Sequence, residues 1–586
     1  MTIPARLSLL LPLALLGGCA TTSARTAAAP GQTVTVGIIA LNDFHGALEP
    51  PRTAALIPGA DPGQARPVPA GGAAFLASAV DSVRAKYPNS ATVAAGDMIS
   101  ASQISSSLFL DEPAIGVLNR IGLDFSAVGN HEFDNGTEEL LRKQKGGCAQ
   151  HTARRPCQVE SFTGAKFRYL AASTRRADGA TIFPATGIKT FGRGRSAVKV
   201  GFIGLTLKDT PSLVSPDGIR GLTFADEAAT INAEVPRLRA GGADAVVVLI
   251  HEGGYTSGRP DPSTCENLTG PIKGILDRLD PGVDVVVSGH THWSYVCDYG
   301  AINAKQPILL TSAGVYGQLV TDITLQIDPG ANRVVSKSAR NVIVQSDPYQ
   351  SPRGFVAEVK ELPRFAARPD VADYVAKYAE AAKAYALRKV GSLAGTVDRA
   401  PSAGLSNQGG PEGNLIADAQ LAATAGAGAQ IAFMNPFGIR KPIAPEADGT
   451  VTFGSIYAAQ PFNNTLITQT MTGAELKAVL EQGFDDSGPQ QVLTPSAAFS
   501  YSIDLSRPVG DRIVAMSLNG QPIDPAANYR VTTNSFLAGG GDSFTLFTRQ
   551  REAVVGMPDI DALEAWLKAV PPRAVPGEDR VKRVGG

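Results

Sequence analysis

The sequence has no excess of charge of either sign. Its 586 residues include 53 Lys and Arg against 54 Asp and Glu. A surface that binds a nucleic acid polymer requires clustered basic residues, so this balance argues against such a partner. Apolar residues make up 44% of the chain and charged residues 18%, which excludes a wholly disordered or fibrous protein. At roughly 150 residues per domain, the length predicts two to four domains.

Long apolar runs are also missing. No stretch after the first twenty residues reaches the 18 apolar residues that a membrane-spanning helix needs, so we expect the rest of the chain to be soluble. Near the start, Arg6 precedes the ten-residue apolar run Leu7–Leu16, a pattern typical of an export signal. Leu16–Cys19 then resembles the bacterial lipobox, in which the cysteine is lipidated and becomes the new N-terminus. The alternative is a plain secretory signal with an incidental Cys19.

The lipobox resemblance implies an exported protein whose acyl chains anchor it stably to a membrane. Ala20 follows the cysteine, and by resemblance to Gram-negative lipoproteins this favours the outer membrane, facing the periplasm or the cell surface. We therefore expect residues 1–19 to be a signal peptide with its lipobox. Residues 20–33, rich in Ala and Thr, would be a tether, and the lipid anchor would be the only membrane contact.

Cysteine is scarce, with five residues including Cys19. The other four, Cys148, Cys157, Cys265 and Cys297, should form two disulfides in an oxidising compartment. Three pairings are open. We favour Cys148–Cys157 and Cys265–Cys297 because each pair brackets a polar, loop-like segment. A zinc site is the weaker alternative, since the chain has no Cys-x-x-Cys pair.

Apolar runs typical of buried strands alternate with helix-like stretches in the first half of the chain. The runs are Val34–Leu41, Ala91–Ala95, Lys199–Leu205, Ala245–Ile250, Val283–Val287 and Pro307–Leu310, and the helical stretches are Gly72–Lys86, Pro113–Ile121 and Ala225–Ala240. This alternation predicts layered α/β packing. Near Asp322–Ile327 and Arg340–Val344, polar and apolar residues alternate, which predicts an antiparallel edge.

A proline-rich segment and a helical pattern, Asp370–Lys389, separate the two halves of the chain. We expect a first domain over residues 34–347, a linker with a helix over 348–390 and a second domain over 391–570. The second domain would begin with a loop, Ala400–Gly413, followed by a helix, Asn414–Ala425. Residues 571–586, rich in Pro, Arg and Lys, would be a poorly ordered tail.

Histidine occurs six times, and five of the six lie in short segments that follow predicted strands. These segments are Asp43-Phe44-His45, Gly129-Asn130-His131-Glu132, His251 at the end of its strand, and Gly289-His290-Thr291-His292; Gly96-Asp97 also follows a strand. Ligand sites of α/β sheets lie at the carboxyl ends of strands, so we expect these segments to converge. The sixth, His151, lies between Cys148 and Cys157 and is expected on the surface.

Seven side chains of these segments are candidate metal ligands: Asp43, His45, Asp97, Asn130, His251, His290 and His292. Carboxylate, amide and imidazole groups together bind borderline divalent ions. Seven donors are too many for one tetrahedral site and suit two ions that share a bridging carboxylate. On an extended chain, Asp43 and His45 would point the same way, because side chains alternate.

The motifs Asp-x-His, Gly-Asp, Gly-Asn-His-Glu and Gly-His-x-His resemble the signature of the calcineurin-like metallophosphoesterases. Asn42–Gly46 and Gly129–Asp134 resemble the 5'-nucleotidase family, which includes bacterial UDP-sugar hydrolases and animal ecto-5'-nucleotidases. The resemblance covers residues 34 to 550. It implies an α/β protein with a four-layer α/β/β/α catalytic domain, a linker helix and a mixed α+β substrate-binding domain.

The resemblance also implies roles for the site residues. Asp43, His45, Asp97 and His292 would hold one divalent ion, zinc, manganese or similar, and Asp97, Asn130, His251 and His290 the other, with Asp97 bridging. His131, oriented by Asp134, would face the substrate phosphate and stabilise charge or protonate the leaving oxygen. Hydroxide generated from water by the two metals would attack phosphorus without a covalent enzyme intermediate.

Three second-domain segments, Met434–Arg440, Pro461–Asn464 and Phe536–Asp542, resemble the family's substrate loops. By resemblance, Arg440 would bind phosphate, Asn435 the base or ribose, and Asp542 the ribose hydroxyls. Phe462 and Phe536 would sandwich a base, a contact worth roughly 1–3 kcal/mol per base. Ordinary core packing is the alternative for each phenylalanine.

One departure from the family concerns the loop before the second domain's first helix. The family usually places arginine there, whereas Ala400–Gly413 has none and Arg399 is the nearest. We expect a two-metal hydrolase of nucleotide phosphoesters outside the cytoplasm, of the 5'-nucleotidase type, with UDP-sugars or 2',3'-cyclic nucleotides as alternative substrates. A non-catalytic binding lipoprotein is disfavoured by the complete donor set, and a hydrolase of non-nucleotide esters, such as a sulfur-oxidation hydrolase, by the Phe462–Phe536 pair. No protein partner is implied.

Overall fold

The computed structural model describes residues 33–585, apart from 52, 60–63, 153, 215, 259, 352–353, 400–404, 406, 463 and 487–488. The expected signal peptide, Cys19 and all but the last residue of the expected tether lie outside the described residues, so lipidation stays a prediction. In the part of the chain that is described, no helix combines the length and apolar character needed to cross a membrane.

The first domain is built on two six-stranded sheets. The first sheet has the order β16-β15-β1-β4-β5-β6 and the second β13-β14-β12-β11-β9-β8. The strands of the first are β1 (Val34–Leu41), β4 (Ser90–Ala94), β5 (Phe125–Ala127), β6 (Arg168–Leu170), β15 (Leu319–Asp328) and β16 (Arg333–Ile343). Those of the second are β8 (Thr186–Phe191), β9 (Val198–Thr206), β11 (Ala245–His251), β12 (Val285–Ser288), β13 (Ser294–Asp298) and β14 (Leu309–Ala313). In each sheet four neighbouring strands are parallel. In the first sheet β15 pairs antiparallel with β1, and β16 pairs antiparallel with β15; in the second, β8 and β13 pair antiparallel with β9 and β14.

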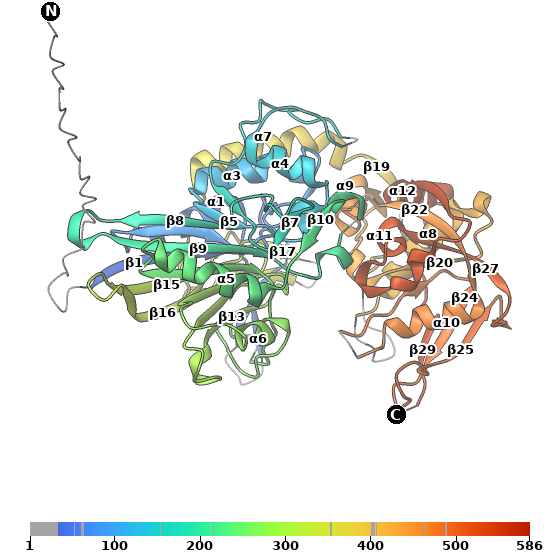
Figure 1. Cartoon of the computed structure of the whole chain (residues 1–586). Helices are drawn as coiled ribbons and strands as arrows, with labels where there is room; N and C mark the ends of the chain where they lie inside the picture. Colours follow the sequence, from blue (N-terminus) through green and yellow to red (C-terminus); the bar gives the residue numbers. More distant parts are fainter. Residues whose placement is uncertain are drawn as a thin grey trace, which may run out of the picture.

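The inner strands are apolar throughout because both of their faces are covered. In β11, for example, Ala245, Val247 and Leu249 face the core between the two sheets, while Val246 and Val248 face the helices outside. Helices α1 (Ala73–Arg84) and α3 (Glu112–Ile121) cover the outer face of the first sheet, and α5 (Glu227–Ala240) and α6 (Pro271–Leu276) that of the second (Figure 1). The predicted α/β/β/α layering is confirmed.

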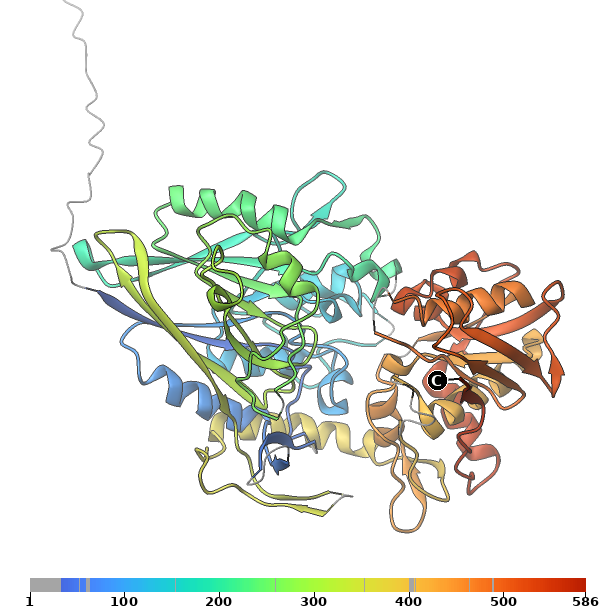
Figure 2. The ribbon, with the colours of Figure 1, turned by 90° about the horizontal axis from the view of Figure 1, so that it is seen from below.

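The linker helix α7 (Pro369–Ala386) belongs to the outer layer of the first domain. Its apolar face, with Val371, Tyr374, Val375 and Tyr378, lies in the same core cluster as α1 and α3. Figure 2 shows the helix running along the first domain towards the second. The connector therefore extends the first domain's packing up to the boundary between the two halves.

The second domain contains a five-stranded sheet, β23-β20-β27-β22-β28, and a four-stranded sheet, β26-β25-β24-β29. Their strands are β20 (Ile431–Met434), β22 (Thr465–Thr472), β23 (Thr494–Pro495), β24 (Phe499–Ile503), β25 (Ile513–Leu518), β26 (Gln521–Pro522), β27 (Asn528–Asn534), β28 (Val554–Pro558) and β29 (Val581–Arg583). Its main helices are α8 (Gly410–Ala423), α9 (Phe453–Ala459), α10 (Gly473–Gln482) and α12 (Asp559–Ala569). The mixed α+β character predicted for this half is observed.

Two predictions for this domain are wrong. Helix α8 begins at Gly410, four residues before the predicted start, because Pro411 occupies a first-turn position where its missing N–H costs nothing. The segment from residue 571, predicted to be poorly ordered, carries β29, which pairs in parallel with β24. Val581 is buried, and Arg580 forms a two-oxygen ion pair with Asp418 on α8.

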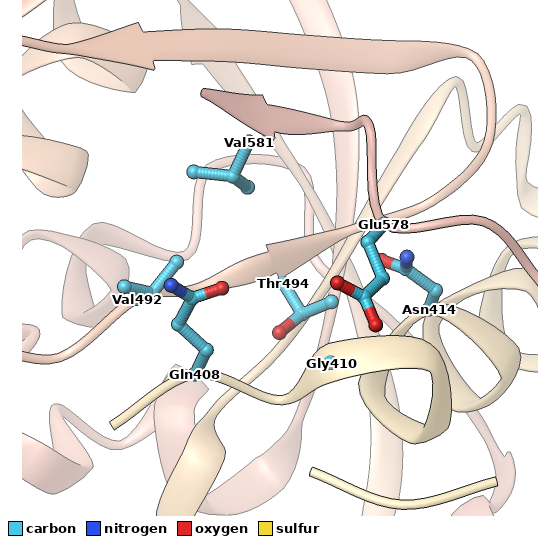
Figure 3. A pocket seen from close by; sticks show the side chains of 7 residues that line it. All are labelled: Gln408, Gly410, Asn414, Val492, Thr494, Glu578 and Val581. Atoms are coloured by element: carbon cyan, nitrogen blue, oxygen red, sulfur yellow. The ribbon is translucent and has the colours of Figure 1, made fainter. Parts of the chain in front are cut away.

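The same C-terminal segment closes a small cavity of about 10 Å³, enough for roughly one water molecule. Glu578 and Val581 of the segment, Asn414 of α8 and Thr494 of β23 line it (Figure 3). The C-terminal residues are therefore part of the domain's packing.

Both favoured disulfides form, Cys148–Cys157 and Cys265–Cys297, so this pairing is confirmed. The first closes a loop beside α4 (Thr137–Lys145), and the second ties β13 to the loop that precedes α6.

Candidate metal centre

The predicted ligand segments meet where the inner strands of both sheets end. Asp43 and His45 follow β1, Asp97 follows β4, and Asn130 follows β5 in the first sheet. From the second sheet, His251 ends β11, and His290 and His292 follow β12. The carboxyl ends of parallel strands thus bring together the predicted donors from five strands.

The donors form two groups. The ligand atoms of Asp43, His45 and His292 all lie within 4.8 Å of one another, and so do those of Asp97, His251 and His290. Asp97 Oδ2 lies 3.0 Å from His251 Nε2 and 3.8 Å from His45 Nε2, so this carboxylate faces both groups.

The seventh donor, Asn130, joins the second group. Its Oδ1 lies 3.1 Å from Nε2 of His251. Two mixed carboxylate and imidazole groups, one of them with an amide oxygen, share a single facing carboxylate, and this donor set fits two divalent ions.

Hydrogen bonds fix the orientation of the imidazoles. The Nδ1 of His45 donates to Ser100 O (3.0 Å) and that of His251 to Ala95 O (2.8 Å), which leaves Nε2 of each ring facing the centre. Asn42 Nδ2 and the backbone N of His290 donate to the Asp43 carboxylate. A metal-ligating histidine typically has such a second partner on its other nitrogen.

Burial also sets the charge of these groups. It lowers the pKa of His45 and of His290 to about 3, so both imidazoles are neutral near pH 7. Burial alone would raise the pKa of Asp97, but the neighbouring His251 holds it well below its usual range. Near pH 7, His45 and His290 are thus neutral and Asp97 is ionised, as a divalent ion requires of its ligands. Burial alone would lower the pKa of His251, but Asp97 raises it to about 10, so an ion bound there must displace the proton of His251.

The backbone of the ligands is strained. Asp43, His45, Asp97, His290 and His292 all have φ between +46° and +69°, a region that few non-glycine residues occupy. The prediction that Asp43 and His45 lie on extended chain is therefore wrong. Left-handed turns, together with a hydrogen bond from His45 N to Asp97 O, direct both side chains inward.

Glu132 has a structural role that the sequence analysis did not assign. This buried carboxylate accepts hydrogen bonds from the backbone N–H groups of Gly129 (2.6 Å), Asp97 (2.9 Å) and Met98 (2.8 Å). It therefore joins the loop after β4 to the loop after β5. The Gly-Asn-His-Glu motif contained it, but the motif says nothing about which backbone groups it would bind.

Tyr316 is a second residue that the sequence analysis missed. Its ring centroid lies 6.0 Å from that of His45 and 6.2 Å from that of His292, and Lys441 Nζ of the second domain lies 4.6 Å from it. No sequence motif marked this position.

His131 lies beside the two groups and is oriented as predicted. Its Nδ1 is 2.8 Å from Asp134 Oδ2, and its ring meets that of His45 edge to face at 5.2 Å. His131 N also donates to Asp97 Oδ1. The Nδ1 contact leaves Nε2 as the nitrogen free to bind a further group.

The second domain's predicted substrate residues face this centre. The Phe462 ring stacks on His131, with centroids 5.8 Å apart and planes inclined by 17°. Arg440 lies over Phe462, and its buried Nη2 has no hydrogen-bond partner in the described part of the chain. Asn435 Nδ2 donates to Asp542 Oδ2 (2.7 Å), so these two also lie together.

Phe536 takes a different position. Its ring packs against Gly541, where a Cβ would lie only 2.5 Å from a ring carbon, so a larger residue there would displace the Phe536 ring. Within the described residues, no ring contact joins Phe536 to Phe462. The base sandwich between these two phenylalanines remains a prediction.

Comparisons with known proteins agree with this centre. The family model of the calcineurin-like phosphoesterases matches residues 37–294, and that of the 5'-nucleotidase C-terminal domain matches residues 389–549. Together they cover both domains. The chain belongs to the calcineurin-like metallophosphoesterases that carry a 5'-nucleotidase C-terminal domain, a class of hydrolases that uses two divalent metal ions.

Individual relatives resemble the chain over most of its length. Endonuclease YhcR of Bacillus subtilis is 29% identical over 94% of this chain, which spans 41% of that protein's length. The 5'-nucleotidase of Diplobatis ommata is 25% identical over 83% of this chain and 81% of its own. A 5'-nucleotidase precursor from Thermus thermophilus shares the fold, with a TM-score of 0.70, 24% identity, and coverage of 94% of this chain and 99% of the other.

Proposed function

We propose that this protein is an exported, lipid-anchored two-metal hydrolase that removes phosphate from nucleotides. The observation that carries the proposal is the position of Arg440 and Phe462, which reach from the second domain to His131 beside the two metal-ligand groups. A phosphate at the metal groups would meet a guanidinium with an unused N–H, and the rest of the nucleotide would extend towards Asn435 and Asp542.

Each group of residues has a separate role in the proposed hydrolysis. Asp43, His45 and His292 would hold one divalent ion and Asn130, His251 and His290 the other, with Asp97 between them. Divalent ions bound there acidify water and neutralise the charge on phosphoryl oxygens. His131, held through Nδ1 by Asp134, uses Nε2 to hydrogen-bond the phosphate or protonate the leaving oxygen. Arg440 orients the phosphate for in-line attack.

Export is supported by the apolar run Leu7–Leu16 with the lipobox-like Leu16–Cys19, and by two disulfides, which persist in oxidising compartments. Labelling with radioactive palmitate tests the anchor. We expect label in the wild type and none in Cys19→Ala. Equal labelling of both proteins would overturn the anchor and leave the hydrolase proposal untouched.

A phosphodiester is the second candidate substrate. The loop before α8 lacks arginine, which leaves Arg440 beside Phe462 and Lys441 beside Tyr316 as the second-domain cations near the metal-ligand groups; so few cations suit an ester with one negative charge. A 2',3'-cyclic nucleotide has this charge and still offers a base and a ribose.

A hydrolysis panel tests the proposal. Protein loaded with manganese, zinc or cobalt is assayed on AMP, ADP, UDP-glucose, 2',3'-cyclic nucleotides and a simple aryl phosphate. We expect a nucleotide to exceed the aryl phosphate in kcat/KM, and Phe536→Ala to weaken nucleotide turnover while sparing the aryl phosphate. No turnover of any ester by the fully metallated protein would refute the enzyme proposal.

A further inference from the structure

Arg154 reaches from the first domain to the second. It lies in the loop closed by the Cys148–Cys157 disulfide, and its guanidinium is 5.3 Å from the ring centroid of Tyr457 on α9. Its Nη1 donates to Ser107 O at the end of α2 (Ile104–Ser107; 2.8 Å) and to the Tyr457 hydroxyl (3.1 Å). One guanidinium therefore joins a helix of each domain.

The Tyr457 hydroxyl continues this chain of contacts. A phenolic hydroxyl has one proton and two lone pairs. Tyr457 gives its proton to Pro461 O (3.0 Å), so its lone pairs are left to accept from Arg154. Tyr457 is 3% exposed, so water does not compete for these bonds as it would at the surface.

Pro461 directly precedes Phe462, the residue whose ring stacks on His131. The contacts thus run from the disulfide loop through Arg154 and Tyr457 to the segment that faces the metal centre. Ile104 of α2 packs against the second-domain core cluster that contains Tyr457, so apolar contacts surround the polar ones.

The disulfide loop is itself fixed at its base. Arg142 donates to Gly147 O (2.7 Å), and the backbone N of Cys157 donates to the Glu112 carboxylate (3.1 Å). Arg142 and Glu112 form a buried ion pair at 2.8 Å. Both ends of the loop are therefore attached to one rigid pair, which keeps Arg154 at a set distance from α9.

We propose that Arg154 is a positioning residue that acts through Tyr457 to hold Phe462 against His131. The hydrogen bond between Arg154 and Tyr457 thereby fixes the position of the Pro461–Phe462 segment relative to the metal-ligand groups. The kinetic part of this inference rests on the proposed function, whereas the position of Phe462 does not.

The test uses the full exported chain with Arg154→Met, Tyr457→Phe and the double variant. Arg155→Met is the matched control, because Arg155 is the exposed neighbour in the same loop. A ring stacked on His131 shifts the imidazole proton resonances, and with six histidines in the chain the His131 signal is found by comparison with His131→Ala.

We expect Phe462→Ala, Arg154→Met and Tyr457→Phe each to move the His131 resonance of metal-free protein in the same direction, and Arg155→Met to leave it in place. We expect KM for the nucleotide to rise at least about tenfold in either single variant, the effect of losing one hydrogen bond to a charged group. Activity on the aryl phosphate should stay within about twofold, because that substrate does not need Phe462. The double variant should resemble the single ones, since both remove the same link.

An unchanged His131 resonance in folded Arg154→Met and Tyr457→Phe overturns the inference, whatever the enzyme hydrolyses. Equal losses on nucleotide and aryl phosphate also overturn it, since they indicate general damage. If the wild type hydrolyses no ester, the proposed function fails, and the resonance still decides the role of Arg154. Tyr457→Phe keeps the ring and its packing, so this variant alone can test the link if Arg154→Met does not fold.

Discussion

The ligand residues combine strain with burial. Five of the seven predicted donors have positive φ, and Asp43, His45, Asp97 and His251 are at most 1% exposed. A non-glycine residue in this region costs of order 1–3 kcal/mol and persists only where its surroundings hold it. Here Glu132 and the backbone hydrogen bonds between the loops after β1 and β4 hold the loops in place. The strained conformations allow donors from two sheets to meet at one point.

Asp97 is the residue whose loss should matter most, because its carboxylate faces both donor groups. We predict that Asp97→Ala lowers the metal content measured by mass spectrometry and reduces kcat/KM at least about a hundredfold. Asp178→Ala, an exposed turn aspartate, is the control and should change neither. Full metal content in Asp97→Ala would contradict the bridging role.

His131 should separate metal binding from turnover. We predict that His131→Ala keeps the metal content and lowers kcat by about 10²–10⁴-fold, the usual contribution of a general acid. His151→Ala removes the exposed histidine of the disulfide loop and should keep the wild-type rate. A wild-type rate in His131→Ala would mean that another group protonates the leaving oxygen.

The sequence was enough to predict which side chains converge, because scarce histidines followed strands that could be recognised by their apolar runs. It did not predict how they converge. The left-handed φ of Asp43 and His45 and the role of Glu132 depend on backbone groups of other loops, which leave no pattern of their own in the sequence. Tyr316 lay outside every motif for the same reason.

At the scale of elements, the ends of the second domain were the least predictable. Strand β29 is short and its flanks are rich in proline and charge, so composition indicated a loose tail. Its pairing partner β24 lies some 80 residues earlier, and only this long-range contact makes it a strand. The inner strands of the first domain were easier to predict from the sequence, since burial on both faces requires a continuous apolar run.

Arg580 tests whether this C-terminal strand contributes to stability. Its two-oxygen pair with Asp418 is mostly buried, with side chains 12% and 13% exposed, and Arg580 also donates to Pro495 O. We predict that Arg580→Met lowers the free energy of unfolding by about 2 kcal/mol, and the domain's Tm by about 4–8 °C in calorimetry. Lys582→Met, on the exposed face of the same strand, should shift Tm by less than about 2 °C. Equal shifts in the two variants would show that the ion pair is not what holds β29.

At the scale of the whole molecule, two domains with separate cores share one site. The first carries every predicted metal ligand, and the second carries the residues predicted to bind substrate, Arg440, Phe462, Asn435 and Asp542. Side-chain contacts that cross between them include Arg154–Tyr457 on one side and Lys441–Thr53 on another. The proline-rich segment suggested a boundary between the domains, but nothing in the sequence marked the contacts that cross between them, because these contacts join residues hundreds of positions apart.

Because all predicted metal ligands lie in the first domain, removing the metal should affect the stability of that domain and not of the second. Ligands that bind only the folded state stabilise it by mass action, by about 2.7 kcal/mol at a hundredfold excess over Kd. We predict that chelation abolishes turnover, removes two ions per chain and lowers the unfolding temperature of the first domain while leaving that of the second unchanged, as followed by calorimetry. Adding manganese or zinc should restore both properties. Asp97→Ala provides the control, since its unfolding should no longer respond to the chelator. A chelator-induced shift of the second domain would place a metal outside the two donor groups, and a stoichiometry of one ion would mean that only one of the two groups binds metal.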